Sequence, residues 1–263
     1  MAVLRLNGVI ATGSRFRSGI NLAGLSSDLD RAYKLRNLKA VALTINSPGG
    51  SPVQSALIAT RIRTLADKKG IPVFAFAEDV AASGGYWLAC SADEIFADQN
   101  SIIGSIGVIY ASFGFQGLLK WLGVERRTYT RGDDKLMLDP FLEEDPGDVS
   151  RLQALQTDVH DSFMTYVRER RGVKLKGDDS QLFNGQVWTG KKAVELGLID
   201  GVGDLHSVLR QRYGDGVKLQ VINRRRGWFN RGLALPVNNP NGTWIEDLIM
   251  AVETREYWRR FGL

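Results

Sequence analysis

The 263-residue sequence predicts an α/β protein with a mainly parallel sheet. Near-continuous apolar runs at residues 40–45 and 73–77 are typical of strands that are covered on both faces. Stretches with apolar residues at helical spacing precede each run, which indicates strands joined by crossover helices. The composition, 44% hydrophobic and 24% charged, is that of a soluble globular protein and excludes disorder as the main state.

The first half of the chain alternates between the two kinds of element. Residues 3–6 alternate like an opening strand, and apolar positions in residues 22–33 and 57–65 predict the two helices that precede the apolar runs. Residues 94–97 and 126–130 predict two further short strands.

The second half is predicted to be mostly helical. A long helix is predicted over residues 149–171, with a start signal in the Asp-Pro pair at 145–146 and a stop signal at Gly172. Two short helices, over residues 191–196 and 204–213, are predicted to follow it.

Charge and composition change near residue 222. Residues 223–263 hold seven arginines against four acidic residues, so this segment carries +3 of the total charge of +5. We predict one domain over residues 1–222, followed by a basic linker and an amphipathic helix over residues 223–263, with the helix at 244–261. That helix is predicted to dock on the core or on a second subunit, or to lie on anionic lipid. The remaining net charge of +2 is spread over residues 1–222, which argues against nucleic-acid binding.

The single cysteine, Cys90, excludes a disulfide framework and a Cys-rich zinc site. It lies in the apolar run 86–90, so we expect a buried side chain rather than a nucleophile. Neither a metal-binding cluster nor a phosphate-binding loop is present in the sequence, and no cofactor is expected. The N-terminus lacks the apolar core of a signal peptide or spanning helix, which predicts a cytoplasmic location.

Two glycine-containing turns each follow a strand-like run. In residues 46–50, paired Gly49 and Gly50 allow backbone N–H groups to face one oxyanion, although a tight turn is the commoner role of such a pair. In residues 81–86, Ser83 is flanked by small residues that permit close approach, although a serine there is more often a helix cap.

A serine nucleophile needs a base. The two histidines, His160 and His206, both fall within predicted helices, where a surface position is more usual than a triad role. The turn around Ser83 also lacks the Gly-x-Ser-x-Gly elbow. A lysine base would need its pKa lowered from about 10.4, and spacing alone does not select one lysine.

Four ordered segments resemble the signal peptide peptidase A family of serine peptidases. They are residues 41–50, 81–86, 104–108 and 122–124, and the similarity extends over about residues 3 to 209.

The resemblance implies roles for five residues. Ser83 matches the family's nucleophile, and Lys135 occupies the place of the general base in single-domain members. Gly50 matches the oxyanion-hole donor, with Gly49 beside it, and Ser105 matches the serine that orients the lysine. Serine–lysine pairs are established variants of the serine triad.

The resemblance also implies a crotonase/ClpP-like core of repeated ββα turns and a homo-oligomeric ring or dome. Its substrates would be signal-peptide remnants or unfolded and small polypeptides. Val53, Val80 and Ile103 lie near the glycine turns and are expected to line the substrate pocket. Many members carry an N-terminal anchor. Either an anchor was removed from this chain, or it is an anchorless cytoplasmic member whose C-terminal segment contacts the inner membrane.

Asp133 and Asp134 directly precede Lys135, and carboxylates near an amine raise its pKa. We therefore predict that both face solvent, whereas residues 136–138 help to enclose the site.

Two other functions are compatible with a fold of this kind. A crotonase-like acyl-thioester enzyme would use the same backbone oxyanion hole, but it would leave Ser83 and Lys135 without roles and expects a carboxylate that neither glycine turn provides. A non-catalytic oligomeric binding module would be marked by loss of the serine or the lysine, and both are present.

Overall fold

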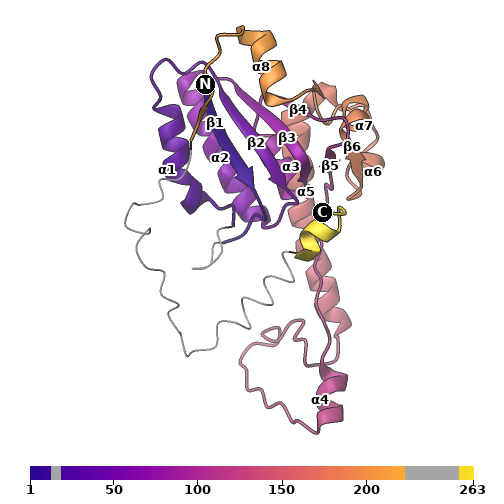
Figure 1. Ribbon diagram of the computed structural model, residues 1–263. Coiled ribbons are helices and arrows are strands. Elements are labelled where there is room, and N and C mark those ends of the chain that lie inside the picture. Colours follow the sequence, from indigo (N-terminus) through magenta and orange to yellow (C-terminus); the bar gives the residue numbers. More distant parts are fainter. Residues whose placement is uncertain (13–18, 223–254) are drawn as a thin grey trace.

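The computed structural model describes residues 1–12, 19–222 and 255–263. Strands and helices alternate through the first half of the chain, which confirms the predicted α/β class (Figure 1). The strands are β1 (Ala2–Asn7), β2 (Val41–Ser47), β3 (Val73–Ala82), β4 (Glu94–Ala97), β5 (Ile102–Gly104), β6 (Val187–Thr189), β7 (Gly201–Val202) and β8 (Gln220–Val221). The α-helices are α1 (Leu22–Tyr33), α2 (Pro52–Lys69), α3 (Gly84–Ala89), α4 (Gln116–Leu122), α5 (Pro146–Arg171), α6 (Asp179–Leu182), α7 (Gly190–Glu195) and α8 (Leu205–Tyr213).

The described strands form one eight-stranded sheet in the order β6-β5-β3-β2-β1-β8, with β4 paired to β3 and to β7. Every pair is parallel except the β5–β6 pair. Residues 74–77 of β3 pair with β4, and residues 80–82 pair with β5. Two strands therefore follow one another along the same edge of β3, and its carboxyl end is held between β2 and β5.

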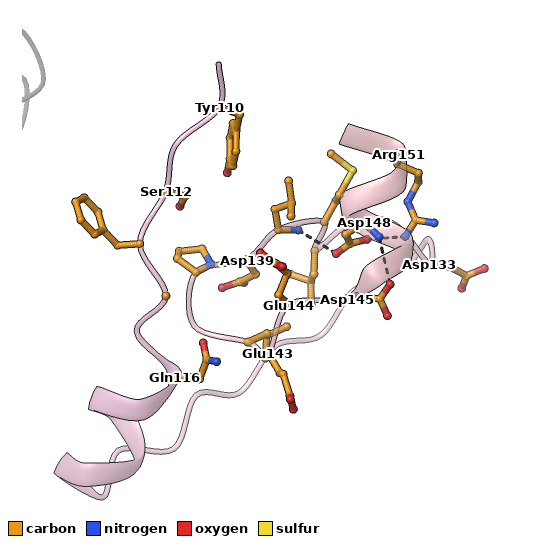
Figure 2. A pocket seen from close by; sticks show the side chains of 17 residues that line it. Tyr110, Ser112, Gln116, Asp133, Asp139, Glu143, Glu144, Asp145, Asp148 and Arg151 are labelled. Carbon is orange, nitrogen blue, oxygen red and sulfur yellow. Dashed lines mark hydrogen bonds and ion pairs between the residues drawn. The ribbon is translucent and has the colours of Figure 1, made fainter. Parts of the chain in front are cut away.

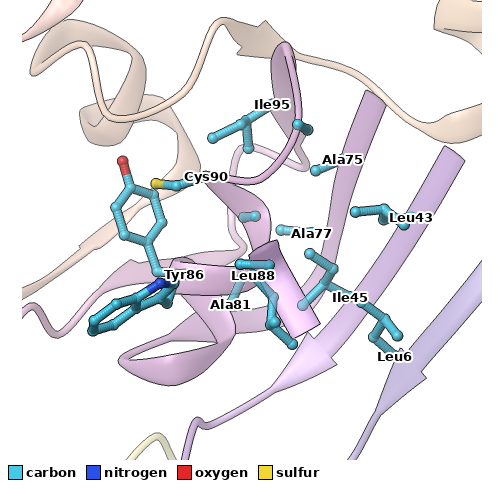
Figure 3. Packing of buried hydrophobic residues seen from close by; sticks show 14 of the residues in the cluster. Leu6, Leu43, Ile45, Ala75, Ala77, Ala81, Tyr86, Leu88, Cys90 and Ile95 are labelled. Atoms are coloured by element: carbon cyan, nitrogen blue, oxygen red, sulfur yellow. The ribbon is translucent and has the colours of Figure 1, made fainter. Parts of the chain in front are cut away.

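The sheet is covered on both faces, as its continuous apolar strands predict. One face packs against α1, α2, α3 and α5, and Figure 3 shows Leu43 and Ile45 on the side of the sheet that faces Leu88 of α3. The other face packs against Leu209 of α8. Cys90 is fully buried, and burial raises the pKa of its thiol to about 12, which confirms an unreactive core residue.

Helix α5 begins and ends at the predicted signals. The Asp145 side chain accepts hydrogen bonds from the N–H groups of Gly147 and Asp148, Pro146 is the first helical residue, and Gly172 follows the last turn. Near its carboxyl end the helix enters the core, where the Phe163 ring stacks on Trp87 with centroids 4.6 Å apart.

Residues 109–145 form an extension that we call the arm, and Figure 1 shows it reaching away from the sheet at the amino end of α5. The predicted strand at residues 126–130 is wrong, because this segment is exposed coil within the arm. Arg126 pairs with Asp139 and stacks over Phe141 instead. A β-prone sequence forms a strand only where a neighbouring strand is available for pairing.

The predicted amphipathic helix at 244–261 lies mainly outside the described residues. The part of it that the structure describes begins at residue 255, and residues 255–259 are helical. The domain boundary at 222/223 stays a prediction. No helix within the described ranges is long and apolar enough to cross a bilayer.

Candidate active site

The candidate site lies where β2, β3 and β5 end. Parallel strands place their carboxyl ends at the same edge of the sheet, which is where ligands bind in α/β proteins. Ala82 of β3 pairs with Gly104 of β5, so Ser83 and Ser105 are the next residues along two adjacent strands. Ser47 of β2 pairs with Ala81, which brings the first glycine turn beside the second.

Ser83 has a backbone conformation that is unusual for a serine. Its φ of 52° and ψ of −124° lie outside the ordinary strand and helix regions, which costs on the order of 1–3 kcal/mol. Its N–H donates to the carbonyl of Gly104 over 2.7 Å, and this bond fixes the turn between β3 and α3. Ser83 occupies the N-cap position of α3, but its side chain makes no capping hydrogen bond and is half-buried. The hydroxyl is therefore available for another role.

The two glycine turns touch one another. Gly49 has a φ of 103°, and a Cβ atom there would lie 2.7 Å from the Cβ of Ser83. A Cβ on Gly84 would lie 2.5 Å from the Oγ of Ser55 and 3.4 Å from the nitrogen of Gly50. Only residues without side chains permit this approach, which sets Gly50 close to the start of α3.

Backbone hydrogen bonds form on both sides of Gly50 but do not use its N–H. Ile10 donates its N–H to the Gly49 carbonyl over 2.8 Å and accepts from the Ser51 N–H over 2.7 Å. These two bonds flank Gly50, and within the described residues its own N–H has no acceptor. An unused backbone donor near the turn that carries a serine is a feature that an oxyanion hole requires.

The remaining predicted site residues lie in different environments. Ser105 is 7% exposed with a φ of 53°, and its N–H donates to the Gln186 carbonyl over 2.7 Å. Val53 is exposed in the first turn of α2, whereas Val80 and Ile103 are completely buried in β3 and β5. Of the three residues expected to line the pocket, only Val53 is exposed.

Lys135 is not brought to Ser83 within one chain. It lies exposed in the arm, where the neighbouring Asp134 pairs with Arg151 near the amino end of α5 over 2.9 Å. Phe163, which packs in the core, lies twelve positions after Arg151 in α5, a rise of about 18 Å. Figure 1 shows the arm at the far end of this helix from the sheet.

The structure confirms the predicted solvent exposure of Asp133 and Asp134. Among the described residues, neither carboxylate pairs with the Lys135 amine. Residues 136–138 are half-buried and line a cavity of about 660 Å³ between the arm and α5, with Arg151 at one end (Figure 2). This cavity lies within the arm rather than at Ser83.

The sequence profile of Peptidase family S49 matches residues 66–218. The match covers more than half of the chain and includes Ser83, Ser105 and Lys135. The chain belongs to peptidase family S49.

Several proteins are similar over most of this S49 chain. A Brucella abortus protein named Na(+)/H(+) antiporter NhaA is 48% identical over 99% of this chain and 36% of its own length. A putative signal peptide peptidase SppA of Enterococcus faecium is 34% identical over 76% of this chain and 59% of its own length. A putative protease of Synechocystis is 32% identical over 77% of this chain and 69% of its own length. The chain thus spans about a third of the first relative and three-fifths of the second.

A histidine base and a bound metal ion are the alternatives to a lysine base at this site. His160 and His206 lie in α5 and α8, as the sequence predicts. In the described ranges, no group of three His, Cys, Asp or Glu side chains could hold a metal ion. Sequence reasoning missed Ile10, whose backbone bonds isolate the Gly50 N–H, and Arg151, whose ion pair lies beside Lys135. Neither residue carries a local motif that could have indicated its role.

Replacement of Gly49 by alanine is expected to lower peptide turnover by about 100-fold, because a misplacement of roughly 1 Å at a reacting group has that effect. The new Cβ would push against Ser83, and the φ of 103° is strained for alanine. Initial rates and a thermal melt would be measured beside Gly117→Ala, which meets open space in helix α4. Wild-type rates in Gly49→Ala would show that this turn does not hold Ser83 in place.

Proposed function

We propose that this chain is a serine endopeptidase in which Ser83 is the nucleophile and Lys135 the general base. The observation that carries the proposal is the uncapped Ser83, held in a strained turn beside the open Gly50 N–H. Membership of family S49 and the names of the relatives support it.

The reaction follows from these groups. The Ser83 Oγ forms a bond to the peptide carbonyl carbon while its proton passes to the neutral Lys135 amine. The carbonyl oxygen becomes an oxyanion that accepts from the Gly50 N–H, with Gly49 shaping the turn. The C–N bond then breaks, and Lys135 returns the proton to the leaving amine. Water attacks the acyl-serine and gives one proton to Lys135. The bond between the carbonyl carbon and the Ser83 Oγ then breaks, and Lys135 returns the proton to Oγ, which releases the acid and restores the hydroxyl and the neutral amine.

The separation of Ser83 and Lys135 is best explained by a site built from two copies of the chain. The arm carries large apolar side chains in water, including Trp121 at 80% exposure and Tyr129 at 91%. An exposed apolar surface of this kind marks a contact with another protein. We therefore infer a homo-oligomer in which the arm of one subunit delivers Lys135 to the Ser83 of a neighbour, where Ser105 would orient the amine.

The proposed substrates are signal-peptide remnants or unfolded and small polypeptides, in keeping with the Enterococcus relative named a signal peptide peptidase. A half-buried nucleophile favours chains that can enter extended over folded domains. Val53 is the exposed candidate for contact with substrate side chains. A cytoplasmic location, with peripheral membrane contact through residues 223–263, completes the proposal, although most of this segment lies outside the described residues.

A fluorophosphonate probe tests the proposed nucleophile without knowledge of the substrate. Its phosphorus forms a bond to the Ser83 Oγ, fluoride leaves, and the serine proton passes to the base. Peptide mapping is expected to place one label on Ser83, and hydrolysis of fluorescently labelled casein is expected to stop in step with labelling. Labelling at another serine, or casein hydrolysis that persists in the fully labelled protein, would overturn the proposal.

A further inference from the structure

The turn that carries Lys135 is attached to the beginning of α5 at two points. On the amino side of the lysine, the Asp134 carboxylate pairs with the Arg151 guanidinium over 2.9 Å. On its carboxyl side, the Leu138 N–H donates to Oδ2 of Asp148 over 3.0 Å. Arg151 and Asp148 are themselves paired over 2.5 Å, so the two attachments form one connected network.

The second attachment supports a strained backbone. Leu138 has a φ of 56°, which a leucine rarely adopts, and the bond to Asp148 compensates for that cost. The hydrogen bond from Leu138, together with that from Arg151, lowers the pKa of Asp148. The carboxylate is therefore charged at neutral pH and available to hold the turn.

Arg151 is the cation that faces Asp134. Its hydrogen bond to Asp148 and the nearby charge of Asp134 raise the pKa of Arg151, which keeps it charged. Asp139 is already paired with Arg126. The acidic groups of the turn, of the arm beside it and of the start of α5 are Asp133, Asp134, Asp139, Glu143, Glu144, Asp145 and Asp148. Asp134 directly precedes Lys135 in the chain, so its carboxylate, once released from Arg151, would be free to approach the lysine amine.

We propose that Arg151 is a positioning residue for Lys135, which holds Asp134 away from the amine and balances its charge. The inference rests on the proposed function of Lys135. It explains how a lysine that directly follows two aspartates can serve as a neutral base.

The sign of the expected effect follows from charge. Serine activation requires neutral lysine, so the rate rises with pH as the amine gives up its proton. Loss of Arg151 would free the Asp134 carboxylate, which stabilises the protonated amine, so a higher pH would be needed to reach the same rate. For exposed charges about 4–6 Å apart, the rising limb is expected to move up by about 0.5 pH unit. The shift is expected to shrink in 1 M salt.

The experiment measures the rate of Ser83 labelling by the fluorophosphonate probe from pH 6 to pH 10. Arg151→Gln keeps the length of the side chain and removes its charge, whereas Arg151→Lys keeps a charge. Arg151→Gln combined with Asp134→Asn removes both members of the pair. Arg127→Ala is the matched control, because Arg127 is another arm arginine in an exposed ion pair. Thermal melts and oligomer size accompany each variant.

The rising limb is expected to move to higher pH in Arg151→Gln and to return in the double variant, while Arg151→Lys and Arg127→Ala keep the wild-type profile. If Arg151 had only a structural role, its loss would lower the rate at every pH, and the double variant would not restore the wild-type profile. An unmoved limb in Arg151→Gln, while Lys135→Ala fails to label, would overturn the inference and leave the proposed function standing. Normal labelling of Lys135→Ala would overturn the proposed function itself.

Discussion

Ser83→Ala and Lys135→Ala chains are each expected to lose at least about 1,000-fold of their casein hydrolysis, as loss of a nucleophile or its base does in serine enzymes. A one-to-one mixture of the two, allowed to exchange subunits, is expected to regain activity. In random assembly, each of the two chains that form a site is the required variant with a chance of about one half. About a quarter of the sites would therefore combine an intact Ser83 with an intact Lys135.

The reason for this recovery is the distance between the two residues in one chain. Lys135 lies in the arm beyond the amino end of α5, and Ser83 lies at the sheet edge. If the arm serves a neighbour, defects on separate chains complement each other, whereas a site within one chain would stay broken in every mixture. Each variant mixed with itself is the control. Mixed oligomers verified by mass spectrometry that remain inactive would contradict the composite site.

Asp200→Ala is expected to destabilise the fold by about 3–5 kcal/mol, the usual effect of removing one partner from a buried ion pair. The Arg171 side chain, 2% exposed, pairs with Asp200 over 2.7 Å and donates two further bonds to the Gly197 carbonyl. Asp200 also accepts from Lys174 and from the Ile95 N–H, and so joins the end of α5 to β4. Its loss leaves a buried guanidinium without its carboxylate, and the melting temperature should fall by about 10 °C.

The pH dependence of this effect has a definite direction. Burial alone would raise the pKa of Asp200, but the hydrogen bonds from Arg171, Lys174 and Ile95 outweigh it and lower the pKa below its usual 3.8. Stability from a lowered carboxyl pKa is present above the unfolded value and is lost as pH falls through the folded value. The difference between wild type and Asp200→Ala should therefore be full at pH 7 and shrink below about pH 4.

The matched control is Asp179→Ala, whose carboxylate is 70% exposed and pairs with Arg168 at the surface. Surface pairs of this kind contribute about 0–1 kcal/mol, so its melt should stay close to wild type. Equal melting temperatures for wild type and Asp200→Ala would show that the buried pair does not hold α5 to the sheet.

The sequence predicts the part of the site that depends on long, regular elements. The continuous apolar runs that become β2 and β3 identify two of the strands at the active edge, and the small residues beside Ser83 mark the turn. Short strands such as β5 have too few residues to show a period, so the placement of Ser105 beside Ser83 could not be derived from pattern alone. The arm was mispredicted because its side chains satisfy one another locally, as Arg126 and Asp139 do, rather than through a sheet.

The pocket residues illustrate a second limit. Proximity in sequence to a glycine turn does not say which face of a strand a side chain occupies, because successive residues point to opposite faces. Ile103 pairs with Ala81 and belongs to the core cluster, whereas Val53 begins a helix and stays in water. The distance from Lys135 to Ser83 is likewise a property of the tertiary fold.

Helix α5 also constrains how this chain can vary in length. Its 26 residues give a rod of about 39 Å, with one end in the core and the other under the arm. Each residue inserted between Pro146 and Phe163 would advance the arm by about 1.5 Å and rotate it by about 100° around the helix axis. An insertion of one residue would therefore point Lys135 in a new direction. An insertion of seven would nearly restore the original direction, with Lys135 farther from the core. The number of residues between Pro146 and Phe163, more than their identity, sets the direction in which Lys135 points from the helix axis.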